Sequence, residues 1–184
     1  TYVTELVDIE DIPKIFNQTY RLDIDKENIK NEFQYYLPNS YDKFDSKMSR
    51  VLHQAVYNLN LSGDLFDGTF LAQPALRVIE GHLKKIVIER NIVPDNNYIK
   101  CNGFNFFDNN GSKYQLKSSH LGTATAAEVS YIGRCYTFYH NNRHILEHWD
   151  DPTAPLDTTK TLDCNQAHDL IRRTLEIIDD FYTI

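Results

Sequence analysis

Hydrophobic residues recur every three or four positions along most of the chain, which is the spacing of one face of an α-helix. The clearest run is Met48, Leu52, Ala55, Val56 and Leu59, which predicts a helix from about Asp45 to Ser62 and Gly63. Similar patterns predict helices over residues 5–21 (broken near Pro13), 25–37 (ending before Pro38), 73–88, 122–140 and 163–181. The chain is therefore predicted to be mainly helical.

The helix predicted over residues 73–88 has Pro74 in its first turn, where the missing N–H does no harm. Its predicted core stripe consists of Leu76, Ile79, Leu83, Ile86 and Val87. Arg77 and Glu80 are three residues apart and share a face beside that stripe. The simplest interpretation is a surface ion pair between them, which contributes little to stability.

The period changes between residues 104 and 116, where two short apolar and aromatic runs flank Asp108-Asn109-Asn110-Gly111. Because Asn-Gly readily adopts the positive φ of a tight turn, this segment predicts a β-hairpin. The fold class is thus mainly α, a helical bundle with a small β-hairpin insertion. The best boundary candidate is residues 37–40. Residues 1–40 are then an N-terminal helical appendage or the end of a preceding domain, and residues 41–184 form the main domain.

Composition narrows the class of protein further. A chain of 184 residues accommodates one domain and a short appendage. Because it opens with Thr1 in an already patterned segment, we expect a fragment of a longer polypeptide. An odd number of widely spaced cysteines, Cys101, Cys135 and Cys164, predicts free thiols in a reducing cytosol. No apolar run reaches membrane-spanning length.

The net charge of −7 argues against a general nucleic-acid coat protein. The charge is uneven, however. Residues 113–148 carry four Lys and Arg against two Glu, together with four of the seven His. Residues 149–184 carry eight acids against three bases. A small phosphate site and an acid-rimmed protein interface both fit a cationic region within an acidic chain.

The densest chemistry lies in residues 140–149, which contain Arg143, three His and Trp149. Arg143 and His148 would lie about 140° apart on one regular helix, so their convergence predicts a helix boundary near Asn141 and Asn142. An Arg keeps its charge, whereas His titrates near neutral pH. Together they supply the cation and the proton-transfer group that metal-free phosphodiester cleavage requires.

Three interpretations of this segment remain open on the residues alone. One is an exposed helix in which Arg143 pairs with Glu147 and the His residues are solvated. Another is a zinc site, since His140, His144 and His148 are spaced at i, i+4 and i+8, and residues 144–148 match H-x-x-E-H, a motif that supplies two His ligands. Its third protein ligand, usually a carboxylate downstream, would be Glu176, which is the only Glu after Glu147. The remaining interpretation is metal-independent RNA cleavage.

A family resemblance favours RNA cleavage. Arg143 followed after four residues by His148 in a helical domain resembles the HEPN superfamily. Residues 74–84, with Arg77-x-x-Glu80, followed by Arg143-x4-His148, more closely resemble the C-terminal domain of the RnlA/LsoA (RNase LS) toxins. The likeness covers roughly residues 45–184. It implies an endoribonuclease without a cofactor or metal, whose catalytic residues are Arg143, His148, Glu80 and Arg77.

The same resemblance implies the biological context. The expected substrate is mRNA, degraded in anti-phage defence, and the expected partners are a cognate RnlB-like antitoxin and a phage-encoded Dmd-like antitoxin. It also implies a cytoplasmic homodimer in which two Arg-x4-His motifs face each other across a two-fold axis. The rival hypothesis is a non-catalytic helical module that only dimerises and binds an antitoxin.

Overall fold

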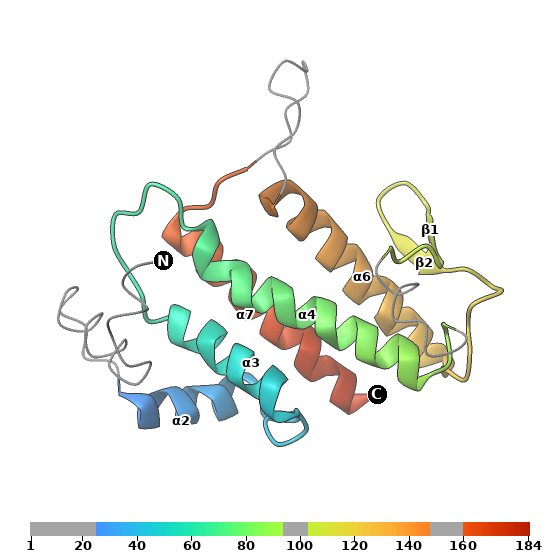
Figure 1. The fold of residues 1–184 in the computed structure, drawn as a ribbon, viewed down its shortest axis with the longest axis horizontal. Helices are drawn as coiled ribbons and strands as arrows, with labels where there is room; N and C mark the ends of the chain where they lie inside the picture. Colours follow the sequence, from blue (N-terminus) through green and yellow to red (C-terminus); the bar gives the residue numbers. More distant parts are fainter. Residues whose placement is uncertain (1–24, 94–102, 148–159) are drawn as a thin grey trace, which may run out of the picture.

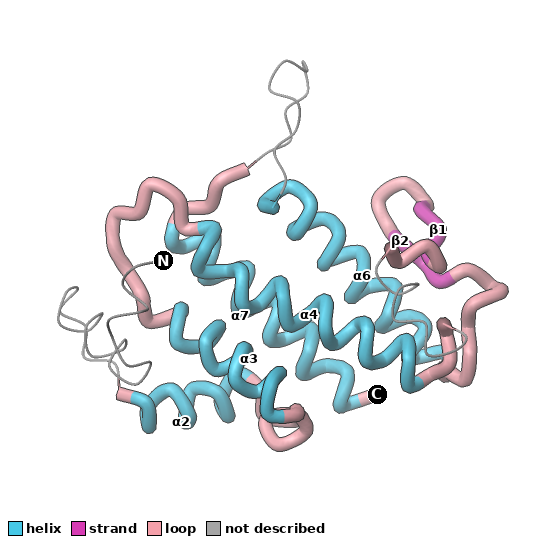
Figure 2. The backbone as a smooth tube through the Cα atoms, viewed as in Figure 1, coloured by secondary structure: helices cyan, strands magenta, loops and turns pink. Residues whose placement is uncertain are grey.

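The computed structural model describes residues 25–93, 103–147 and 160–184, and it is dominated by helices (Figures 1 and 2). Its elements are α2 (Lys26–Tyr36), α3 (Ser46–Asn58), α4 (Thr69–Glu89), β1 (Phe107–Asn109), β2 (Tyr114–Leu116), α6 (Ala126–Glu147), α7 (Cys164–Asp180) and the 3₁₀ turn η1 (Phe181–Thr183). The predicted mainly helical fold with a small β-hairpin is confirmed. The helix expected over residues 5–21 lies outside the described residues, as does the loop expected at 150–155.

Helix α4 is the centre of the bundle and contacts α3, α6 and α7 (Figure 1). The predicted core stripe is confirmed, because its five residues are each at most 1% exposed. Burying each of these aliphatic side chains stabilises the fold by about 1.5–3 kcal/mol relative to exposure. Buried His82 adds a polar contact to α6, since its Nε2 lies 2.9 Å from the Tyr131 hydroxyl. Burial, with a smaller contribution from the nearby charge of Lys85, lowers the pKa of His82 to about 3, so this imidazole is neutral.

Aspartates begin three of the helices, as the sequence predicts. Asp25, Asp45 and Asp163 are the N-caps of α2, α3 and α7, and each side chain accepts hydrogen bonds from backbone N–H groups of the first turn. Helix α3 ends at Asn58, before the predicted stop at Ser62 and Gly63. The backbone continues there as tight turns, in which Leu61 N donates to Asn58 O.

Helix α4 begins earlier than predicted, so the placement of Pro74 in its first turn is wrong. The extra turn is held locally, because Thr69 N donates to Asp67 Oδ1 over 2.8 Å. It is also held by a distant residue: Gly68 N donates to Leu162 O over 2.6 Å, and Leu162 N donates to Thr69 Oγ1 over 3.2 Å. Leu71 and Ala72 are also fully buried. These tertiary contacts offset the backbone hydrogen bond that Pro74 cannot donate inside the helix.

The hairpin packs on α6 and turns where the sequence predicts. Strands β1 and β2 pair antiparallel, and Gly111 has a φ of +82° in the turn between them. The first strand starts at Phe107, not Phe104, because Phe104 itself has a φ of +46°. A Cβ on Gly133 of α6 would lie only 2.9 Å from Tyr114 O, so glycine is needed for this close approach.

Helix α6 runs without a break through Asn141 and Asn142, so the predicted boundary there is wrong. Asn142 Nδ2 donates to Phe138 O over 2.7 Å, which keeps this amide within its own helix. Buried Tyr136 and Tyr139 anchor the preceding turns, and His140 Nε2 lies 3.2 Å from the Tyr114 hydroxyl. These contacts to the hairpin and core extend the helix beyond its local signals.

Residues 25–40 pack against the bundle through a buried carboxylate. Asp179, which is 6% exposed on α7, accepts hydrogen bonds from Asn39 N (3.0 Å), Asn39 Nδ2 (2.7 Å) and Ser40 Oγ (2.6 Å). Leu37 and Ser40 are fully buried. The domain boundary at residues 37–40 stays a prediction.

We expect Asp179→Asn to lower the free energy of unfolding by about 3 kcal/mol, because an amide cannot accept all three bonds and the charge-assisted bonds are lost. Urea unfolding measures the change. The matched control is Asp180→Asn: Asp180 pairs with Arg134 at 2.8 Å, but its side chain is 41% exposed. That change should cost no more than about 0.5 kcal/mol. Equal losses from the two variants would contradict a special role for Asp179.

Cys135 and Cys164 are free thiols, and Cys101 lies outside the described residues. Within the described ranges, no helix combines the length and the apolar character that a membrane span requires.

Candidate functional site

Helices α4 and α6 bring together three of the four predicted catalytic residues. Arg77, Glu80 and Arg143 line one cavity of about 600 Å³, whose other lining residues are Arg50, Val51, Gln54, Phe70, Gln73, Pro74 and Glu147. Burial of Leu76 and Ile79 fixes the rotation of α4 and turns Arg77 and Glu80 toward this cavity. His148, the fourth predicted residue, lies outside the described residues.

The Glu80 carboxylate contacts groups on both helices. Lys84 Nζ lies 2.5 Å from Oε1, Arg143 Nε lies 3.7 Å from Oε2, and the Tyr139 hydroxyl is also hydrogen-bonded to it. In the described parts of the chain Glu80 has no ion pair with Arg77, so the simple surface pair predicted between those two residues is wrong. The side chain of Glu80 therefore links α4 to α6.

These contacts control the ionisation of Glu80. Burial raises its pKa and is the largest single influence. The hydrogen bond and charge of Lys84, the Tyr139 hydrogen bond and the charge of Arg143 together outweigh burial, so the net pKa is lowered. Burial, with the nearby charge of Glu80, raises the pKa of Tyr139, which keeps its phenol protonated as a donor. Glu80 is thus a carboxylate at neutral pH.

This lowered pKa predicts a pH dependence of stability. A carboxyl group with a lowered pKa in the folded state stabilises the protein above the pKa of the unfolded chain, about 4.3, and this stabilisation is lost as the pH falls through the folded-state value. Urea unfolding of the wild type and Glu80→Gln should therefore differ at neutral pH, with the wild type more stable, and converge at strongly acidic pH. Glu176→Gln, an exposed change on α7, is the control. A difference that stays constant down to acidic pH would contradict the assignment.

Arg143 is held by acids of both helices, and its side chain is 35% exposed. Its Nε lies 2.7 Å from Glu147 Oε2, and its guanidinium carbon lies 5.6 Å from the centroid of the Tyr139 ring. The Arg143–Glu147 pair of the solvated-helix interpretation is therefore present, next to the contact with Glu80. Both ion pairs reach Arg143 through Nε.

The contacts of His140 do not support the zinc interpretation. His140 contacts Tyr114, and Glu176 is exposed on α7. Across residues 25–93, 103–147 and 160–184 no group of three His, Cys, Asp or Glu side chains is arranged to hold a metal. Because His148 is outside these ranges, the zinc site stays an untested alternative.

Sequence reasoning missed two residues of the site, Lys84 and Tyr139. Both had a usable signal, since Lys84 follows Glu80 by four residues and Tyr139 precedes Arg143 by four residues. The contact between Tyr139 and Glu80 had no such signal, because it joins two helices.

Fold and site together are those of a bacterial toxin family. Residues 25–150 match the family described as "RNase LS, bacterial toxin DBD domain", and the chain belongs to it. The chain is 27% identical over 178 residues to the mRNA endoribonuclease LsoA of Escherichia coli O157:H7, covering 97% of this chain and 49% of LsoA. It thus spans about half the length of that relative.

A solved structure supports the same relationship. The crystal structure of Escherichia coli toxin LsoA in complex with the T4 phage antitoxin Dmd matches with a TM-score of 0.73 at 25% identity, covering 97% of this chain and 68% of that chain. The resemblance to RnlA/LsoA toxins inferred from the sequence is confirmed.

Proposed function

We propose that this chain carries the active site of a metal-independent HEPN-type endoribonuclease that cleaves mRNA as the toxin of an anti-phage toxin–antitoxin system. The observation that carries the proposal is the meeting of Arg77, Glu80 and Arg143, from two helices, at one cavity. The name of the relative LsoA, an mRNA endoribonuclease, supports the reaction class. The cytoplasm, where mRNA is found, is the proposed location.

The proposed reaction is an internal transfer at one phosphodiester. The imidazole of His148 takes the proton of the 2′-hydroxyl, and the 2′-oxygen then forms a bond to the adjacent phosphorus. The bond between phosphorus and the 5′-oxygen breaks, and a protonated partner group gives the leaving oxygen its proton. The products are a 2′,3′-cyclic phosphate and a 5′-hydroxyl.

The other three residues stabilise the negative charge of the phosphorane and position the reacting groups. Arg143 stabilises the negative oxygens of the phosphorane with its terminal amino groups. Arg77 adds positive field and holds the RNA. Glu80 orients Arg143 and favours the charged form of a neighbouring imidazole. Lys84 and Tyr139 hold Glu80 in place.

Chelation provides the test of this chemistry. We expect the purified protein to cleave single-stranded RNA at an unchanged rate in excess EDTA, because no proposed step uses a metal. Mass spectrometry of the fragments should show cyclic phosphate ends. Loss of cleavage on chelation, restored by added zinc, would favour the H-x-x-E-H alternative.

A second candidate function is a non-catalytic module for dimerisation and antitoxin binding. The observation that favours it is the solved complex of the related toxin LsoA with Dmd. We propose that this chain also binds a cognate RnlB-like antitoxin and a Dmd-like phage antitoxin, and that it forms a homodimer. The two candidates differ in one measurable property. Only the enzyme has an RNA cleavage rate, and that rate falls when the site residues are changed.

A further inference from the structure

A second cavity lies next to the cavity that contains Arg143. It has a volume of about 580 Å³, lies between α3 and α4, and shares Val51 and Arg77 with the cavity that contains Arg143. We call these two adjoining cavities together the α3–α4 groove. It runs from Lys47 and Lys85 to Arg143.

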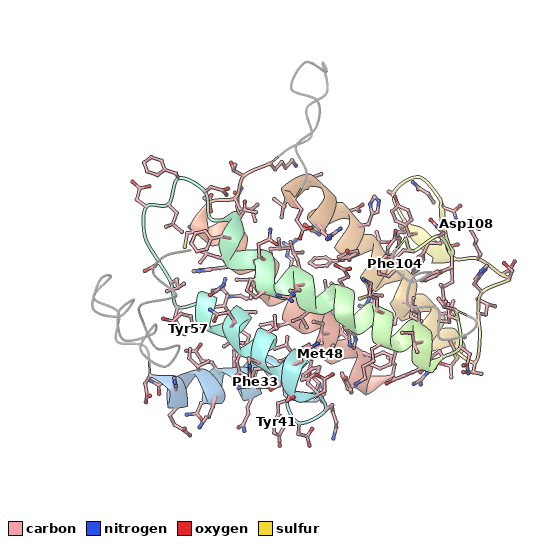
Figure 3. All side chains as sticks on the ribbon, in the orientation of Figure 1. Phe33, Tyr41, Met48, Tyr57, Phe104 and Asp108 are labelled. Carbon is pink, nitrogen blue, oxygen red and sulfur yellow. The ribbon has the colours of Figure 1, made fainter. Side chains whose placement is uncertain are left out.

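The floor of this groove is open because α4 carries a glycine there. A Cβ on Gly81 would already lie 3.8 Å from Met48 Cε, and Met48 lies on the side of α3 that faces α4 (Figure 3). A larger side chain at position 81 would fill the space between the two helices. The floor itself is lined by Met48, Val51 and Val78, so polar ligands must be held from the rims.

Several cations on the rims of the groove are held in no ion pair within the part of the chain that the structure describes. Lys47, Arg50, Arg77 and Lys85 have no ion pair with any residue in the described ranges. Two acids of the groove are in ion pairs, Glu80 with Lys84 and Glu147 with Arg143. The Asp45 carboxylate caps α3 by accepting from Lys47 N and Met48 N, and the charges of Lys85 and Lys47 help to lower its pKa. Glu89 is the remaining acid of the lining. The lining of the groove thus has five Lys and Arg side chains against four Asp and Glu, a net charge of +1 in a chain whose net charge is −7.

An exposed aromatic ring lies at the end of the groove where Arg143 is found. Phe70 lines the cavity that contains Arg143, and it is 56% exposed. An exposed ring beside a row of cations is the arrangement by which proteins bind single-stranded nucleic acid, with phosphates on the cations and a base stacked on the ring.

We propose that the α3–α4 groove binds a single RNA strand next to the scissile phosphate, with Lys47, Arg50 and Lys85 contacting phosphates and Phe70 stacking on a base. The proposal rests on the endoribonuclease function proposed above and names where its substrate lies. Arg77 and Lys85 are separated by about 12 Å along the axis of α4. A stacked strand rises about 3.4 Å per nucleotide, so the groove accommodates about three to four phosphates.

The first test measures RNA affinity against salt concentration. In a His148→Ala background that does not cleave, fluorescence anisotropy follows binding of a labelled single strand of about ten nucleotides. Each phosphate contact contributes about 0.7 to the slope of log K against log salt. The triple variant Lys47→Gln, Arg50→Gln, Lys85→Gln should therefore lower the slope by about 2 and weaken binding at least about tenfold.

The matched control removes the same charge elsewhere. Lys26→Gln, Arg172→Gln, Arg173→Gln changes exposed residues of α2 and α7 that line neither cavity. We expect its slope to stay within about 0.5 of the parent. Equal losses in the two triple variants would overturn the proposal, because they would report net charge and not the groove.

Substrate length and base stacking give the second test, in a chain with an intact site. The double variant Lys47→Gln, Lys85→Gln, which leaves every residue of the site cavity in place, should raise KM for the longer RNA. Its kcat/KM for a dinucleotide should change less than about twofold, since a dinucleotide does not reach Lys47 or Lys85. Phe70→Ala should weaken binding of the longer strand about fivefold to a hundredfold, whereas Phe70→Trp should retain it. Phe66→Ala changes another exposed Phe in the segment before α4 that lines neither cavity, and should have no effect.

The outcomes separate this inference from the proposed function. Loss of dinucleotide cleavage equal to the loss on long RNA would overturn the groove assignment but leave the ribonuclease intact. Absence of cleavage by the wild type, with salt-dependent RNA binding through the groove, would overturn only the catalytic function. If the groove variants bind RNA as the parent does but lose antitoxin binding, the groove is a protein interface and the inference fails.

Discussion

Replacing His148 by Ala should lower RNA cleavage by about a hundredfold or more, because a general acid–base group is removed from the chemical step. The comparison is the cleavage rate of wild type and variant at saturating RNA. Toxicity in cells should disappear with the activity, while antitoxin binding and dimerisation persist. Unfolding in urea should change by no more than about 1 kcal/mol if the imidazole lies at the rim of a cleft.

The control is His144→Ala, one residue from Arg143 and part of the zinc motif. The ribonuclease mechanism assigns it no proton to transfer, so its cleavage rate should stay close to that of wild type. If both variants keep full activity, the assignment of His148 fails. If both lose it while the fold persists, the paired histidines of the zinc alternative are favoured.

Replacing Arg143 by Gln should lower kcat by about a hundredfold to a thousandfold, which is the usual effect of removing one preorganised donor from a developing oxyanion. Arg143→Lys should restore only a small part of the rate, because a lysine ammonium cannot reproduce the guanidinium fork. The rates are measured in single-turnover cleavage of a defined RNA. Recovery of nearly full activity by lysine would show that charge alone is required.

The control for Arg143 lies on the same helix. Arg134 pairs with Asp180 at 2.8 Å, its side chain is 56% exposed, and it does not line the site cavity. Arg134→Gln removes the same charge from α6, so it should leave kcat unchanged. A similar loss in both variants would assign the effect to the charge of the helix as a whole.

The contacts of Glu80 differ from the surface ion pair with Arg77 that the sequence predicts. The pKa of Glu80 is lowered because the hydrogen bonds and charges of Lys84, Tyr139 and Arg143 together outweigh the effect of burial. A surface pair with Arg77, which is the simplest prediction from their spacing, would not couple α4 to α6. The contact with Arg143 does so, because it joins residues that are distant in the sequence.

The sequence by itself determined the elements that depend on neighbouring residues. Asp25, Asp45 and Asp163 begin their helices because a side-chain oxygen satisfies backbone N–H groups within one turn. The turn of the hairpin lies at Asn110 and Gly111 because of local backbone preference. The apolar spacing along α4 predicted its buried face, because residues three or four positions apart lie on the same side of a helix. The Arg77-x-x-Glu80 and Arg143-x4-His148 motifs indicated the family from sequence alone.

Only the tertiary structure decided features that depend on contacts between distant segments. Helix α4 begins at Thr69 because Asp67 accepts a hydrogen bond from Thr69 N and Leu162 bonds both Gly68 N and the Thr69 side chain. The contacts with distant Leu162 help to offset the cost of Pro74 inside the helix. Helix α6 continues past Asn142 because its preceding turns pack on the core and hairpin. The choice of Lys84 and Arg143 as partners of Glu80 depends on how α4 and α6 pack. Helix propensities differ by less than about 1 kcal/mol per residue, except for a proline inside a helix, which costs about 3 kcal/mol. Burial of several side chains and long-range hydrogen bonds together override both.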